Sequence, residues 1–202
     1  METVSQHRRG TSRNSVIHNG VLGVLIFLAT EVMLFGGLIS ALIVNRADYT
    51  GAWPPVDWLG VLPFTWTAIN TSFLLMSGVT MYLVVREIGK SKEMDKKKVN
   101  LLLVATLFLG YLFVALQGAE WVALMSENKS MTTDLYGSFF YLIIGAHGIH
   151  ALGGLFYLTA IVIKIAKASD FDLIKKSISS SSIYWYFVVG LWPILYVLVY
   201  MY

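Results

Sequence analysis

The sequence contains no cysteine and little charge, since only 13% of its 202 residues are Asp, Glu, Lys or Arg. Without cysteine the chain can have no disulfide framework, no iron–sulfur cluster and no thiolate metal site. Hydrophobic residues make up 56% of the chain, which is too many for an ordinary soluble domain. We therefore expect a membrane protein without a separate soluble domain.

The apolar residues form five runs, and a helix needs about 20 residues to cross a bilayer. The runs are Val21–Val44, Phe64–Val85, Leu101–Leu124, Phe139–Ile163 and Ile183–Met201. They predict an all-α fold, an integral membrane bundle of five transmembrane helices at 21–202, after a cytoplasmic segment at 1–20. The first run exceeds the roughly 7–15 apolar residues of a cleavable signal peptide, so we interpret it as a retained anchor.

Lysine and arginine alternate between rich and poor connecting segments. Residues 1–20, 86–98 and 164–182 carry three, six and four of them, whereas 45–63 and 126–136 carry one each. By the positive-inside rule the N-terminus is predicted to be cytoplasmic and the C-terminus external. The same distribution explains the net positive charge, so we expect no nucleic-acid partner.

Local patterns predict how the helices meet. Three prolines should make the first outer segment fold back onto the bundle: Pro54, Pro55 and Pro63. Small residues four apart in the first run favour close helix packing: Gly36 with Ser40, and Gly37 with Ala41. Six side chains of the second run are expected to bond to other helices: Thr67, Asn70, Thr71, Ser72, Ser77 and Thr80. We interpret Ser177–Ser182 as a polar loop.

Polar side chains inside a membrane are costly and mark candidate sites. The runs contain Glu31, Gln117, Glu120, His147 and His150. The two histidines lie about 60° apart on one helix face, and the third run has the same spacing between its glutamine and glutamate. These two runs should be antiparallel neighbours, so we expect Glu120 to meet the histidines, with His147 as the nearer partner. Glu31 is expected to be neutral or bonded to a neighbouring helix.

The residue types argue against chemistry in this chain. The H-E-x-x-H zinc pattern is absent, and the carboxylates are too few for a di-iron site. Two histidines on one face of one helix cannot bind a haem iron from opposite sides. We predict no catalytic residue and no metal ligand, and interpret the polar cluster as structural or lipid-contacting. The alternative is an independent intramembrane metal enzyme that uses His147, His150 and Glu120.

Three ordered segments resemble subunit III of the haem–copper terminal oxidases of aerobic respiration. They are Thr30–Phe35, Leu116–Trp121 and Gly145–Gly154, of which the last contains both histidines. Asn70–Gly78 and Tyr184–Trp192 are similar to two further helices of that family. The resemblance covers about residues 20–202 and fits the short, five-helix form.

The resemblance implies a non-catalytic subunit that binds phospholipid, stabilises the catalytic subunit, and supports electron transport and proton pumping. It implies no cofactor in this chain, with haem and copper in partner subunits. The expected partners are oxidase subunits I and II, membrane phospholipids and a larger respiratory supercomplex, in a bacterial inner membrane. The electron donor, cytochrome c or quinol, stays open. An accessory subunit of nitric oxide reductase is the alternative within this family.

Two departures from the family pattern affect these expectations. The family often has His and Asp in its last helix where this chain has Tyr186 and Val189, so we expect that helix to pack differently. The short form also lacks two N-terminal helices that form one wall of a lipid-holding cleft in longer members. We expect another subunit to complete that cleft, or the cleft to be incomplete.

Overall fold

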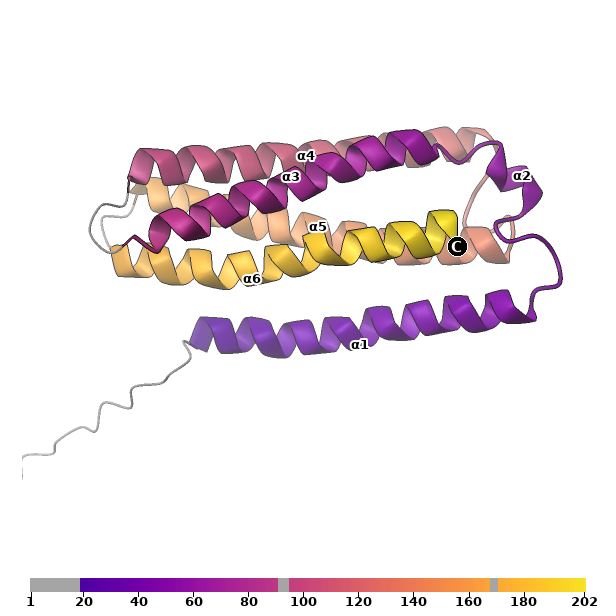
Figure 1. Cartoon of the computed structure of the whole chain (residues 1–202), viewed down its shortest axis with the longest axis horizontal. Helices are drawn as coiled ribbons and strands as arrows, with labels where there is room; N and C mark the ends of the chain where they lie inside the picture. Colours follow the sequence, from indigo (N-terminus) through magenta and orange to yellow (C-terminus); the bar gives the residue numbers. More distant parts are fainter. Residues whose placement is uncertain (1–18, 91–94, 168–170) are drawn as a thin grey trace, which may run out of the picture.

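The computed structural model describes residues 19–90, 95–167 and 171–202 and contains long helices that run along one common axis (Figure 1). They are α1 (Asn19–Asp48), α3 (Phe64–Ile88), α4 (Lys96–Ser126), α5 (Leu135–Lys167) and α6 (Phe171–Tyr196). A short α2 (Val56–Leu59) lies between α1 and α3, and a π-helical turn, η1 (Val197–Met201), follows α6. Five helices of the described part are long and apolar enough to cross a membrane, which confirms the predicted number.

Two of these helices begin well before the apolar runs that predict them. α4 starts at Lys96 because Asp95 caps it, with Oδ1 accepting from the backbone N–H groups of Lys97 and Lys98 at 2.9 and 3.2 Å. α6 starts at Phe171, so the prediction of a loop at Ser177–Ser182 is wrong. The serine hydroxyls there donate to carbonyls three or four residues earlier, which keeps them inside the helix.

Side-chain hydrogen bonds join α3 to its neighbours, as predicted for five of the six polar residues. Buried Trp185 and Trp192 of α6 donate through their indole N–H groups to Ser77 at 3.2 Å and Thr71 at 2.8 Å. The other three bonded residues reach α4: Thr67, Asn70 and Thr80. The hydroxyl of Ser72 donates only to a carbonyl of α3 itself, so the prediction is wrong at this position.

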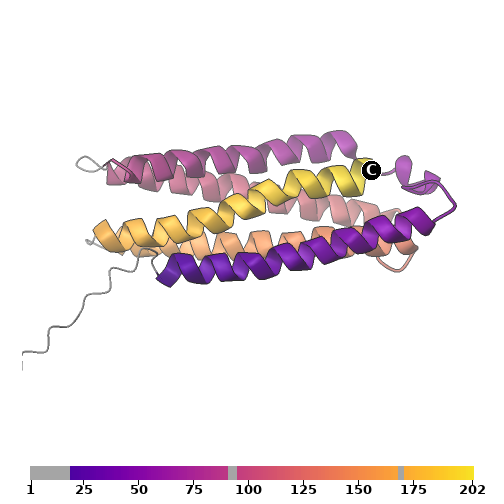
Figure 2. The same ribbon diagram turned by 60° about the horizontal axis from the view of Figure 1, so that its bottom comes forward.

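α1 lies at the edge of the bundle, packed against α6 and, over a smaller area, against α5 (Figure 2). Its buried face contains Glu31, Phe35 and Leu42. The predicted close packing at Gly36 and Gly37 is wrong within the chain, because a Cβ at either one meets nothing within 4 Å in the described residues. The rest of α1 presents a largely apolar surface outward.

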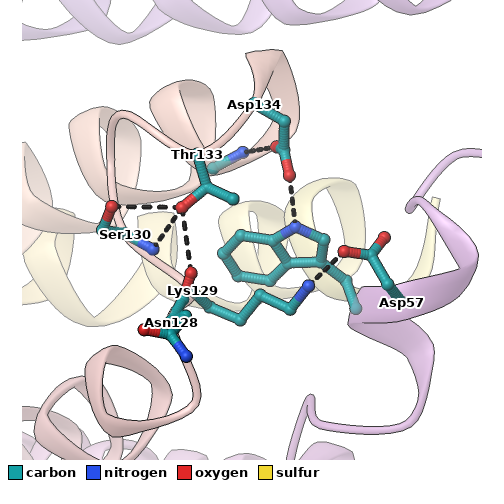
Figure 3. Close-up of polar contacts among 8 residues, drawn as sticks. Asp57, Asn128, Lys129, Ser130, Thr133 and Asp134 are labelled. Carbon is teal, nitrogen blue, oxygen red and sulfur yellow. Dashed lines mark hydrogen bonds and ion pairs between the residues drawn. The ribbon is translucent and has the colours of Figure 1, made fainter.

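The loop between α1 and α3 folds back as the prolines predict, and the α4–α5 loop covers it (Figure 3). The indole N–H of fully buried Trp58 donates to Asp134 Oδ2 at 2.7 Å, while Asp134 Oδ1 accepts from the backbone N–H of Gly137 at 2.7 Å. The ammonium of Lys129 pairs with Asp57. These contacts join the α1–α3 and α4–α5 loops into one layer.

Helix packing predicts opposite effects on stability for alanine substitutions at two glycines. A Cβ at Gly110 would lie 2.5 Å from Leu155 and 3.0 Å from Trp185, both fully buried, so Gly110→Ala should destabilise the protein by about 1–3 kcal/mol. A Cβ at Gly190 meets nothing within 4 Å in the described chain, and alanine favours a helix over glycine by up to about 1 kcal/mol. Thermal unfolding in detergent should therefore show a lower melting temperature for Gly110→Ala alone. Equal losses in both variants would contradict this packing.

The ion pair between these two loops predicts a pH-dependent stability. The hydrogen bond from Lys129 lowers the pKa of the Asp57 carboxyl below its ordinary value of 3.8, and the lysine charge adds to this. Such a group stabilises the folded state above its unfolded pKa and loses that contribution as the pH falls through its folded pKa. The melting temperature of the unsubstituted protein should exceed that of Asp57→Asn at neutral pH. The difference should disappear on acidification below pH 3.8.

The control for the ion pair is Asp48→Asn, at the exposed end of α1. This variant should follow the unsubstituted protein at every pH, and high salt should shrink the Asp57 effect because the carboxyl is exposed. A difference that persists at acid pH would show that the substitution acts through something other than the ion pair.

Candidate functional site

A hydrogen-bonded network connects α3, α4 and η1 near the end of the bundle at which the chain ends. Nε2 of Gln117 donates to the hydroxyl oxygen of Tyr200 at 3.1 Å, and that hydroxyl donates to Oε1 of Glu120 at 2.6 Å. The hydroxyl of Thr67 donates to the other carboxyl oxygen, Oε2, at 2.8 Å. Both oxygens of Glu120 therefore have partners from other helices.

Asn70 extends this network toward the membrane centre. Its Nδ2 donates to the carbonyl of Phe113 at 3.1 Å and to Oε1 of Gln117 at 3.4 Å. Oδ1 of the same amide is buried and has no hydrogen-bond partner in the described residues. Gln117 and Glu120 thus have hydrogen-bond partners in the network, whereas the acceptor Oδ1 of Asn70 has none among the described residues.

The second polar group is a contact between α1 and α5. Nε2 of His150 lies 2.6 Å from Oε2 of Glu31, so an imidazole nitrogen of α5 faces a carboxyl oxygen of α1. Nδ1 lies 2.6 Å from the carbonyl oxygen of Ala146. Because a carbonyl can only accept, Nδ1 carries a hydrogen and Nε2 is the nitrogen that faces the carboxyl. Glu31 is thus in contact with a neighbouring helix, as predicted.

His147 lies one turn before His150 on α5 and is only 1% exposed. Three aromatic rings surround it, with centroids 5.0 Å away for Trp192, 6.4 Å for Phe113 and 6.5 Å for Phe35. Neither ring nitrogen has a hydrogen-bond partner among the described residues. The prediction that His147 partners Glu120 is therefore wrong, because the carboxyl turns toward α3 and η1 instead.

The predicted polar set thus divides into three places. Gln117 and Glu120 belong to the network, His150 pairs with Glu31, and His147 is alone. Within residues 19–90, 95–167 and 171–202, no three His, Asp or Glu side chains come together as a metal site would require. The trio of the alternative metal enzyme forms no such group there, because Glu120 bonds to α3 and η1 while His150 faces Glu31.

One member of the network, Tyr200, is not among the site residues that sequence reasoning selects. It is 1% exposed, and its hydroxyl links Gln117 to Glu120. A tyrosine near the end of a membrane span is typical of an interfacial anchor, so the sequence gives no reason to place it in a buried network. The sequence signal that could have found it is the third apolar run, whose two polar side chains, Gln117 and Glu120, need partners from other helices.

The two positions that depart from the family pattern differ in their burial on α6. Val189 is buried and packs against Gly78 of α3, where an added Cβ would lie 3.0 Å from the valine side chain. Tyr186 is 36% exposed. At position 189 this chain therefore has an apolar side chain packed closely on α3, where the family pattern has a polar residue.

These features define a multi-pass membrane protein whose buried polar side chains bind to one another across helices. Residues 3–202 match the family model described as cytochrome c oxidase subunit III. The chain therefore belongs to the cytochrome c oxidase subunit III family. It is subunit III of a haem–copper terminal oxidase of the cytochrome c or quinol type, and members of this family carry no redox centre of their own.

Relatives of both types are similar over most of the chain. The probable cytochrome c oxidase subunit 3 of Nocardia farcinica is 32% identical over 184 residues, which cover 89% of this chain and 86% of the relative. The quinol oxidase subunit 3 of Bacillus subtilis is 30% identical over 186 residues, covering 90% and 86%. Cytochrome c oxidase subunit 3 of Mus musculus is 29% identical over 182 residues, covering 88% and 67%.

The network predicts a specific cost for the loss of one hydroxyl group. Tyr200→Phe leaves Nε2 of Gln117 and Oε1 of Glu120 without their shared partner, which should destabilise the protein by about 1–3 kcal/mol. Tyr157→Phe, on the exposed surface of α5, is the matched control and should change stability little. Thermal unfolding of both variants in detergent tests this, and equal melting temperatures would show that the Tyr200 hydroxyl stabilises nothing.

Proposed function

We propose that this chain is a non-catalytic subunit that stabilises the catalytic subunit I and its turnover. The observation that carries the proposal is the pairing of the buried carboxyl groups. Oε2 of Glu31 lies against His150, and the two carboxyl oxygens of Glu120 accept hydrogen bonds from Tyr200 and Thr67. Groups that bind one another across helices hold a bundle in one arrangement and are not available as ligands for an oxygen-reducing metal.

We propose that the end of the bundle that carries the start of α1 is cytoplasmic. At that end Arg86 lies in the last turn of α3, Lys90 follows the helix, and Lys96–Lys98 begin α4. Arg46 and Lys129 are at the opposite end (Figure 1). This asymmetry follows the positive-inside rule and supports an external C-terminus.

We propose the plasma membrane of a bacterium as its location. The chain covers 86% of the relatives from Nocardia and Bacillus but 67% of the one from mouse. This supports the short, five-helix form of the subunit. Subunits I and II are the partners that membership in such a complex implies, and subunit I is expected to cover part of the exposed apolar surface.

Phospholipid binding is supported by a groove between α3 and α4 near their outer ends. Its volume is about 760 Å³. Most of its lining is apolar and includes Trp66, Ile69, Phe73 and Leu116, and its polar residues are Asn70, Glu120, Ser126 and Glu127. An acyl chain fits such a surface, because it covers apolar side chains that would otherwise lack a well-packed neighbour. The groove is lined by residues of this chain.

Loss of the contact between α1 and α5 should lower the number of turnovers before inactivation more than it lowers the initial rate of oxygen reduction. Glu31→Ala leaves His150 without its carboxyl partner and weakens the attachment of α1, which has few other buried contacts. In the purified native complex, the first oxygen-reduction rate should stay within about twofold while the number of turnovers before inactivation falls severalfold. Oxygen uptake followed to inactivation measures both quantities.

Met33→Ala is the control for this experiment, because Met33 lies on the same helix and is 76% exposed. Glu31→Gln should restore part of the endurance, since an amide can still bond to the imidazole. An immediate loss of all turnover in a fully assembled Glu31→Ala complex would overturn the proposed structural role.

A further inference from the structure

The groove between α3 and α4 extends inward from the end of the bundle at which the chain ends. On α4 its lining runs from Glu127 to Leu116, a rise of about 16 Å at about 1.5 Å per residue. The hydrocarbon of one leaflet is about 15 Å thick, so the groove has the length of one leaflet. The residues at its end, which we call its mouth, are Gly60, Val61, Pro63, Ser126 and Glu127.

The mouth lies at the level of lipid headgroups. Trp66, in the first turn of α3, lines the groove and is 73% exposed. Tryptophan is enriched where the membrane meets water, so this side chain places the mouth at the interface. A phospholipid in the groove would therefore have its headgroup beside the mouth and an acyl chain along the apolar lining.

The charged side chains that line the groove are acidic. They are Glu120 and Glu127, and no lysine or arginine of the described chain lines it. Both oxygens of the Glu120 carboxyl already accept hydrogen bonds from other helices. The exposed carboxyl of Glu127, in contrast, belongs to none of the ion pairs that the described residues form. Glu127 is therefore the charge that a headgroup would meet.

The cations at the same end of the bundle have other partners. The ammonium of Lys129 pairs with Asp57, and Lys129 is only 9% exposed. The guanidinium of Arg46, on α1, lies 3.4 Å from the ring centroid of Tyr202. Since neither side chain lines the groove, a headgroup with a net negative charge would find no cation there.

The ends of two helices complete the mouth. α3 begins and α4 ends there, since the two helices are antiparallel neighbours (Figure 1). No side chain caps α3, so N–H groups of its first turn are open to an acceptor, and the start of a helix favours a phosphate. The end of α4 favours a cation, and its C-cap is Glu127 itself. One rim of the mouth thus favours negative charge and the other favours positive charge.

We infer that this groove selects a phospholipid whose headgroup carries an ammonium group, such as phosphatidylethanolamine, over one with a net negative charge. The phosphate would lie at the start of α3 and the ammonium group against the Glu127 carboxylate. Phosphatidylglycerol has the same phosphate but no cation, so its charge would be repelled by Glu127 without compensation. The inference rests on the phospholipid binding proposed above and adds the chemistry of the headgroup.

The test uses the purified native complex and two phospholipid probes that carry the same photoreactive acyl chain. One probe has an ethanolamine headgroup and the other a glycerol headgroup. After illumination, mass spectrometry should find the label in segments 60–73 and 116–127 of this chain. The ethanolamine probe should label them about threefold more than the glycerol probe, and high salt should narrow the difference.

A charge reversal connects this preference to the mouth. Glu127→Lys should abolish or invert the preference for the ethanolamine probe in these two segments. Asp48→Lys is the matched control, because it makes the same change of charge at the exposed end of α1, outside the lining, and should keep the preference. Equal labelling by the two probes in the unsubstituted complex, or an unchanged preference in Glu127→Lys, would overturn the inference.

A second substitution separates headgroup selection from phospholipid binding itself. Ala119→Phe places a large side chain in the groove and should lower labelling by both probes, whereas Ala115→Phe, exposed on α4 outside the lining, should not. Equal labelling by the two probes that Ala119→Phe removes would overturn the selection and leave phospholipid binding standing. Absence of label from both segments with either probe would overturn both.

Discussion

Hydrogen bonds between side chains of different helices are the interactions on which the rest of this bundle depends. In hydrocarbon a polar group has no water as an alternative partner, so an unpaired group costs more than in a soluble protein. α3 contributes most of these bonds, with Trp192 bound to Thr71 and Trp185 bound to Ser77. Each hydrogen-bonded pair sets the position of one helix along the axis of its neighbour. Apolar contacts between similar surfaces would allow the helices to shift relative to each other.

The number and identity of the membrane helices could be predicted from length and hydropathy, since a span needs about 20 apolar residues. Their ends could not, because capping and side-chain bonds act outside the apolar runs. Asp95 begins α4 ahead of its run, and the serines of α6 bond to their own helix. Proline positions did predict the fold-back of the first outer loop, whose Trp58 is fully buried.

The sequence predicts which residues belong to the candidate site, but it predicts only some of the contacts between them. Polar residues inside apolar runs are evident from the sequence, and so is the need of Glu31 for a neighbour. Which neighbour each residue meets depends on helix rotation and relative depth, which spacing along one helix does not give. Glu120 and His147 belong to adjacent helices but face different neighbours, and Tyr200 closes the network from the far end of the chain.

The edge position of α1 has a consequence for how the protein is made. Glu31 is synthesised about 120 residues before His150, which at ordinary elongation rates is a delay on the order of 10 s. α6, the other helix against which α1 packs, emerges later still. During synthesis α1 therefore waits in the membrane without its partners, and the contact that attaches it closes a long loop. Of the five spanning helices, the first to be made is thus among the last to be secured.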